Sequence, residues 1–99
     1  MVIEHVLLAV ISGQEAAFET AMVKAGGIVA TVPGFISLSV RPSLEQKGQY
    51  LMLIEWESVD AHKEGFRKST AYQDWKALLH HFYDPIPTVN YYGDTIVSG

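Results

Sequence analysis

The chain has 99 residues, which suits one domain over residues 1–99 and leaves no room for a second. Its 7 basic and 11 acidic side chains give a net charge of −4 without a basic cluster, so neither nucleic acid nor an anionic membrane is an expected partner. Because there is no cysteine, disulfides, thiolate catalysis and cysteine-ligated metals are excluded.

The first twelve residues do not look like a targeting segment. They lack a basic start and carry Glu4 and His5, so they do not fit a signal peptide. No apolar run approaches the roughly 18 residues of a membrane-spanning helix. We therefore expect a cytoplasmic protein.

The first half of the chain predicts a strand, a helix and a second strand. Residues 2–11 are apolar at nearly every position and read as a strand. Ser12 and Glu15 fit a capping box at the start of a helix, which Pro33-Gly34 ends. Residues 35–41 alternate as a strand does. One apolar stripe at helical spacing contains Phe18, Ala21, Met22, Ala25 and Val29.

The second half predicts a strand, two helical segments and a last strand. Residues 50–56 form a nearly continuous apolar strand. Ser58 is expected to cap a short helix to about residue 68, and Ser69 a second one to about residue 83. Two prolines follow, after which residues 88–97 predict a strand. The apolar stripe of the second helix contains Tyr72, Trp75, Leu79 and Phe82.

This order, β-α-β-β-α-β, predicts an α+β ferredoxin-like fold with an antiparallel sheet and helices on one face. Strands on such a sheet should alternate apolar and polar residues, because one face meets water. Residues 2–11 and 50–56 do not alternate clearly. A second copy packed on the helix-free face would bury the excess apolar side chains, so we expect a homodimer.

The sequence contains no recognised metal or cofactor motif. His80 and His81 are adjacent and point about 100° apart on a helix, so they cannot hold one ion together. No nucleophile elbow, phosphate loop or dinucleotide fingerprint occurs. We therefore expect no cofactor.

A group of rings and histidines is the best candidate for a binding site. His62 and Phe66 share a helix face at i, i+4, and Tyr72 and Trp75 share one at i, i+3, with Leu79 continuing their stripe. If both faces look at the sheet, they enclose a pocket that suits a flat phenolic or quinoid molecule. His62 is the candidate proton acceptor, because the histidine pKa lies near neutral pH.

Structural roles compete with these functional ones. Trp75 and Phe82 fit a hydrophobic core as well as a pocket, and His62 fits a solvated first helical turn. His5 is either an interface histidine or a donor in the pocket wall. Trp56 ends its strand, where it would lie at the rim of a pocket or at an interface.

The stretches Pro33-Gly34-Phe35, Ile54-Glu55-Trp56-Glu57-Ser58 and Ala61-His62, together with Phe66-Arg67-Lys68-Ser69 and Tyr72, resemble the antibiotic biosynthesis monooxygenase superfamily. The resemblance extends over essentially the whole chain. It implies a dimeric α+β barrel with a pocket between sheet and helices in each subunit. It also implies cofactor-free oxidation of phenols or quinols by dioxygen, in which the deprotonated substrate supplies the electrons.

The grouping of rings and histidines, taken together with this resemblance, suggests His62 as the base and Tyr72 and His5 as residues that orient the substrate. The wall would be formed by Phe66, Trp75, Leu79 and Trp56. Haem degradation, another activity of the superfamily, is not expected, because Trp75 or Lys76 stands near the axial histidine position. Two alternatives remain. One is a non-catalytic binding module of the same fold, and the other is an isomerase of the superfamily.

Overall fold

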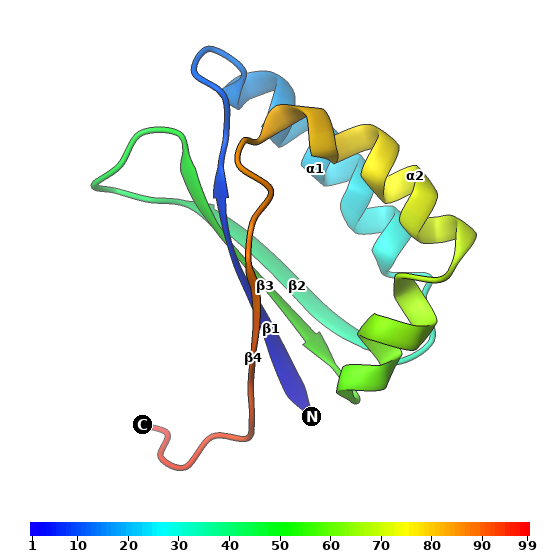
Figure 1. Cartoon of the computed structure of the whole chain (residues 1–99). Helices are drawn as coiled ribbons and strands as arrows, with labels where there is room; N and C mark the ends of the chain where they lie inside the picture. Colours follow the sequence, from blue (N-terminus) through cyan, green and yellow to red (C-terminus); the bar gives the residue numbers. More distant parts are fainter.

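The computed structural model describes all 99 residues as one sheet with its helices on one face (Figure 1). The helices α1 and α2 lie side by side over the sheet, and its other face is left open. The elements in chain order are β1 (Val2–Ala9), α1 (Glu15–Val29), β2 (Phe35–Pro42), β3 (Gln49–Trp56), η1 (Ala61–Phe66, a short π-helix), α2 (Thr70–Leu79), η2 (His80–Phe82, a 3-10 turn) and β4 (Val89–Tyr92). This confirms the predicted α+β ferredoxin-like fold.

The strand order is β2-β3-β1-β4, with every neighbouring pair antiparallel. In the register, Glu4 of β1 is opposite Ile54 of β3 and Tyr91 of β4. Directly opposed residues point to the same face of an antiparallel sheet. Glu4 and Tyr91 therefore lie side by side beneath the helices.

The core lies between the helices and the sheet. Alternate residues of β3, Tyr50, Met52, Ile54 and Trp56, are buried against the helices. From α1 the core receives Phe18, Met22, Ala25 and Val29, as the sequence stripe predicts. Trp75 and Leu79 of α2 complete it.

Local backbone geometry and hydrogen bonding confirm one predicted element boundary and correct two others. Ser69 does cap α2, since its Oγ accepts from the backbone N–H of Tyr72 at 3.2 Å. The capping box at Ser12 is wrong, because Gly13 turns the chain with φ +88° and α1 begins only at Glu15. The last strand is shorter than predicted, because Tyr92 already pairs with Ile3 and β1 has only one residue left beyond it.

The helix-free face of the sheet is apolar at its centre. It carries Ile3 and Leu7 of β1 beside Leu51 and Leu53 of β3, and Leu7 is 47% exposed. The unalternating sequence of these strands therefore corresponds to an open apolar face. That a second copy covers it remains a prediction. No helix has the length and apolar character needed to cross a membrane.

Candidate functional site

The turn after β3 brings η1 over the first residues of β1, where His62 lies beside Glu4. Ser58 Oγ accepts a hydrogen bond from the backbone N–H of Ala61 at 3.1 Å, which fixes the first turn of this segment. His62 and Phe66, four residues apart, then face the sheet and are both buried. The predicted shared face is confirmed, and the surface alternative for His62 is wrong.

Phe66 lies at the centre of a cluster of rings. Its centroid is 5.7 Å from that of Trp56, 5.3 Å from that of Tyr72 and 5.6 Å from that of Trp75. The contacts with Tyr72 and Trp75 are edge-to-face, a favoured arrangement for aromatic pairs. The residues that the sequence placed in one aromatic group therefore do meet in space.

A buried polar network lies against these rings. Oε1 of Glu4 accepts a hydrogen bond from Nε1 of Trp56 at 2.9 Å and lies 3.4 Å from Nε2 of His62. Nδ1 of His62 is 2.5 Å from the hydroxyl of Tyr91. Glu4 and His62 are each only 3% exposed. Nδ1 of the imidazole is thus hydrogen-bonded and Nε2 lies near a carboxylate oxygen, whereas Oε2 of Glu4 makes no hydrogen bond.

Burial shifts the pKa values of this pair in opposite directions. Loss of hydration raises the pKa of Glu4 above its ordinary value, although the Trp56 hydrogen bond and the charge of Arg67 act against the rise. The same loss of hydration lowers the pKa of His62 to about 4, assisted by the charges of Arg67 and Lys63. His62 is therefore a neutral imidazole at neutral pH.

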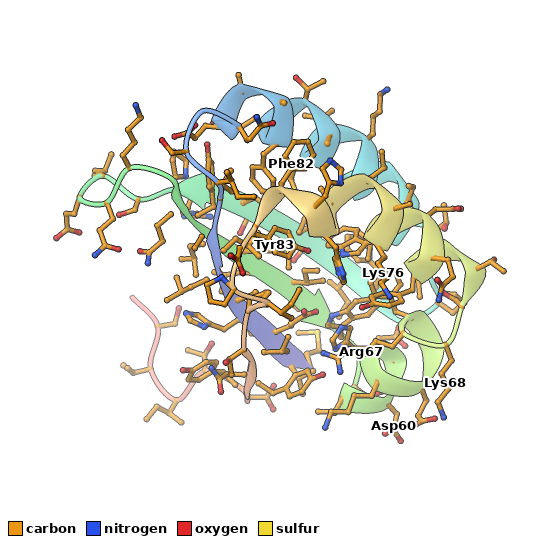
Figure 2. The ribbon with its side chains drawn as sticks, turned by 45° about the horizontal axis from the view of Figure 1, so that its top comes forward. Asp60, Arg67, Lys68, Lys76, Phe82 and Tyr83 are labelled. Atoms are coloured by element: carbon orange, nitrogen blue, oxygen red, sulfur yellow. The ribbon has the colours of Figure 1, made fainter.

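A small cavity of about 60 Å³ lies between these groups and the sheet. Figure 2 shows Arg67 turned toward the sheet, whereas Lys68 and Asp60 lie at the outer edge of the molecule. The polar or ionisable side chains lining the cavity are Glu4, His62, Arg67, Tyr72, His80 and Tyr83. This composition suits a small molecule that carries an acidic proton and a developing negative charge.

The predicted site residues separate into three groups. His62, Tyr72, Phe66 and Trp75 line the cavity. Leu79 and Trp56 are fully buried in the adjoining core, so they support the cavity without lining it. The structure does not bring His5 into this site.

His5 points to the open face because side chains alternate along a strand and Glu4 and Val6 face the helices. There it borders a shallow groove with Leu7 and the segment Pro85–Thr88. Its Nδ1 is buried without a hydrogen-bond partner. Of its two predicted alternatives, the donor in the wall of this cavity is wrong.

Sequence reasoning missed five polar residues of the site, Glu4, Arg67, His80, Tyr83 and Tyr91. A signal for Glu4 was present, because it occupies the same alternating set as Val6 and Leu8, whose side chains must be buried. An acid in such a set requires partners. No local pattern could have placed Tyr91 beside His62, since that contact depends on the pairing of β4 with β1.

A larger groove of about 400 Å³ lies elsewhere, between α1 and β2. Its lining is mostly apolar, and its polar feature is the hydrogen bond from the Tyr50 hydroxyl to Glu19 Oε2 at 2.5 Å. Because it is open and holds none of the polar network, we assign the candidate site to the smaller cavity. No group of three or more His, Asp or Glu side chains is placed to hold a metal ion.

Comparison with known proteins identifies the class. The family profile described as antibiotic biosynthesis monooxygenase matches residues 1–78. An uncharacterised Bacillus subtilis (strain 168) protein, YczJ, is 45% identical over 94 residues, which cover 95% of this chain and 99% of that protein. The chain therefore belongs to the antibiotic biosynthesis monooxygenase family.

Solved structures share the fold over nearly the whole chain. A Bordetella bronchiseptica protein named for the same family superimposes with a TM-score of 0.91 at 26% identity, covering 96% of this chain and 97% of its own. SnoaB, a cofactor-independent oxygenase from Streptomyces nogalater, gives a TM-score of 0.80 at 14% identity, covering 97% of this chain and 95% of its own. At that identity SnoaB supports the fold alone.

Proposed function

We propose that this chain oxidises a phenolic or quinol-like small molecule with dioxygen, in the cavity between sheet and helices, without a cofactor. Membership of the family supports a monooxygenase-type function in general. The observation that carries the finer proposal is the buried carboxylate–imidazole pair of Glu4 and His62 within a wall of rings. A group that accepts a proton in a dry aromatic site is what such a reaction requires.

In the proposed reaction the Glu4–His62 pair takes the proton of the phenolic hydroxyl. The resulting anion transfers electrons to dioxygen, and the ring C–H carbon opposite the hydroxyl takes one oxygen atom and becomes C=O. The ring leaves as a quinone, and the second oxygen atom leaves as water with the two hydrogens lost from the C–H and O–H bonds. Arg67 stabilises the negative charge and Tyr72 orients the ring, while Phe66 and Trp75 exclude solvent. His5 takes no part, because it lies on the other face of the sheet.

The cavity must widen to admit a ring. Its volume of about 60 Å³ is smaller than the roughly 150 Å³ of an engineered cavity that holds one benzene. Tyr72 and His80 line the cavity and are half-buried, so they have solvent to move into. We expect these two side chains to rotate outward when a substrate binds.

The test is turnover of a panel of naphthols and anthrones by the purified protein, followed as dioxygen uptake and carbonyl product. We expect turnover in air, none without dioxygen, and incorporation of one labelled oxygen atom from ¹⁸O₂. Heat-denatured protein controls for autoxidation, and Lys68→Ala, at an exposed position between η1 and α2, is the matched variant control. Equal rates with and without dioxygen, or no turnover above the denatured control, would contradict the proposal.

One alternative is a binding module of the same fold that performs no chemistry. Such a module would bind members of the panel and return them unchanged. Calorimetric binding to the wild type without any product on prolonged aerobic incubation would establish this alternative.

A further inference from the structure

We infer that Glu4 is the group that takes the ligand's proton, and that His62, with its tautomer fixed by Tyr91, is a positioning residue for that carboxylate. The inference rests on the proposed binding of a phenolic molecule and deepens it by naming the base. It reverses the role that the sequence suggested for His62.

With Glu4 ionised, as a proton acceptor must be, the contacts of the network allow one consistent placement of protons. The indole N–H of Trp56 can only donate, so Oε1 of Glu4 accepts. A neutral His62 carries one N–H. Because Nε2 lies beside the ionised carboxylate of Glu4, the hydrogen is on Nε2. Nδ1 must then accept, so the Tyr91 hydroxyl donates to it.

This placement leaves His62 no nitrogen that can accept a ligand's proton. Its one acceptor, Nδ1, is occupied by the Tyr91 hydroxyl, and its one hydrogen is on Nε2, which lies 3.4 Å from Oε1 of Glu4. In contrast, Glu4 lines the cavity and its Oε2 makes no hydrogen bond. The open acceptor that a phenolic hydroxyl can reach therefore belongs to the carboxylate.

The charges around Glu4 support the same assignment. Burial raises its pKa toward that of an effective base, whereas His62, with a pKa lowered to about 4, would be a weak one. In the proton transfer the phenolic O–H bond breaks, an O–H bond forms at Glu4 Oε2, and the electron pair stays on the phenolic oxygen. The titratable and charged groups that face Glu4 from the neighbouring elements are His62, Arg67, Tyr72, His80, Tyr83 and Tyr91.

The experiment uses 4-nitrophenol, whose anion absorbs visible light, added at a pH one unit below its own pKa. We expect the wild type to bind it as the anion, Glu4→Gln to bind it as the neutral phenol, and His62→Asn still to bind it as the anion. Glu4→Gln keeps the acceptor for Trp56 and so preserves the fold, which near-ultraviolet circular dichroism verifies. Glu55→Gln, on the opposite sheet face, is the matched control. The inference would be overturned if the wild type bound no 4-nitrophenol anion or if Glu4→Gln bound the anion. It would also be overturned if His62→Asn were the one variant that lost anion binding.

Turnover and NMR separate this inference from the proposed oxidation. Glu4→Gln should lower kcat/KM by about 10² or more. His62→Asn should lower kcat/KM about tenfold, the effect of one charge-assisted hydrogen bond, and should move the acid limb of the kcat/KM–pH profile to higher pH.

In ¹⁵N NMR, His62 should carry its proton on Nε2, and Tyr91→Phe should mix the tautomers. A proton on Nδ1 in the wild type would contradict this assignment. Absence of turnover with an intact nitrophenol response would overturn the oxidation and leave the base assignment standing.

Discussion

A methyl group placed on Gly34 would come within 2.6 Å of Cβ of Ala61, so the turn before β2 is in direct contact with the start of η1. Gly34 has φ +88°, and its carbonyl accepts the backbone N–H of Glu57 at 2.8 Å. This contact fixes the path of the chain between β3 and η1. His62, the next residue after Ala61, is thereby held over β1.

Gly34→Ala should therefore destabilise the protein. The added Cβ meets Ala61, and a positive φ is strained for alanine, so we expect the free energy of unfolding to fall by about 2 kcal/mol. Gly27→Ala is the matched control, because an added Cβ there meets nothing within 4 Å and helix propensity favours alanine. Urea unfolding of both variants checks this, and equal stability of the two would contradict it.

Wild-type stability should decrease between pH 6.5 and about pH 4, in part because of His62. Its pKa is lowered from 6.5 in the unfolded chain to about 4 in the folded one, so protons bind the unfolded state more tightly in this range. The resulting loss is up to about 3 kcal/mol at the acid end. His62→Gln should flatten this part of the curve in denaturant titrations, whereas exposed His81→Gln should not. An unchanged slope in His62→Gln would show that folding does not lower the pKa of His62.

Glu4→Gln should stabilise the protein at pH 7 while lowering the proposed activity. The raised pKa of Glu4 means that its neutral form stabilises the fold below about pH 4.5, and that this stabilisation is lost as the pH rises through the folded value. A neutral amide avoids that loss, so we expect a gain of about 1 kcal/mol at pH 7 that disappears in acid. Thermal unfolding at both pH values measures it. A variant less stable than wild type at pH 7 would contradict this, and would indicate that the Trp56 hydrogen bond and the charge of Arg67 outweigh the cost of burying the ionised carboxylate.

Phe66→Ala should cost about 3–5 kcal/mol, because it removes the ring at the centre of the aromatic cluster. Phe66→Leu keeps most of the volume and should cost less than half as much. Both variants enlarge the cavity, so we expect them to bind two-ring naphthols more rapidly than the wild type in stopped-flow fluorescence. Leu78→Ala, half-buried on α2 and absent from the cavity lining, is the control for stability without enlargement.

The open sheet face provides a test of assembly. If a second copy covers it, light scattering should give about twice the chain mass of 11.0 kDa. Leu7→Glu places a charge at its centre and should yield monomers. Val23→Glu, at a position 81% exposed on α1, should not. A monomeric wild type, or dimers of Leu7→Glu, would exclude this face as the interface.

The fold was predictable because its signals are local. Helical stripes such as Phe18 to Val29 and the Ser69 cap act within a few residues, and they determined the element order. The aromatic site was predictable for the same reason, since His62 with Phe66 and Tyr72 with Trp75 are fixed by helical spacing. The Glu4–His62–Tyr91 network could not be predicted, because it joins three elements through the strand register.

The elements that carry the site residues determine how substitutions would change the ligand specificity of such a protein. Glu4 and Tyr91 come from paired strands, and His62 from η1, whose start contacts Gly34, so the proposed acid–base groups are held by the sheet and the turn beside it. Tyr72, Trp75 and His80 come from α2 and the turn that follows it. Substitutions confined to that helical segment would therefore alter the shape of the accepted molecule while the proton chemistry stays the same.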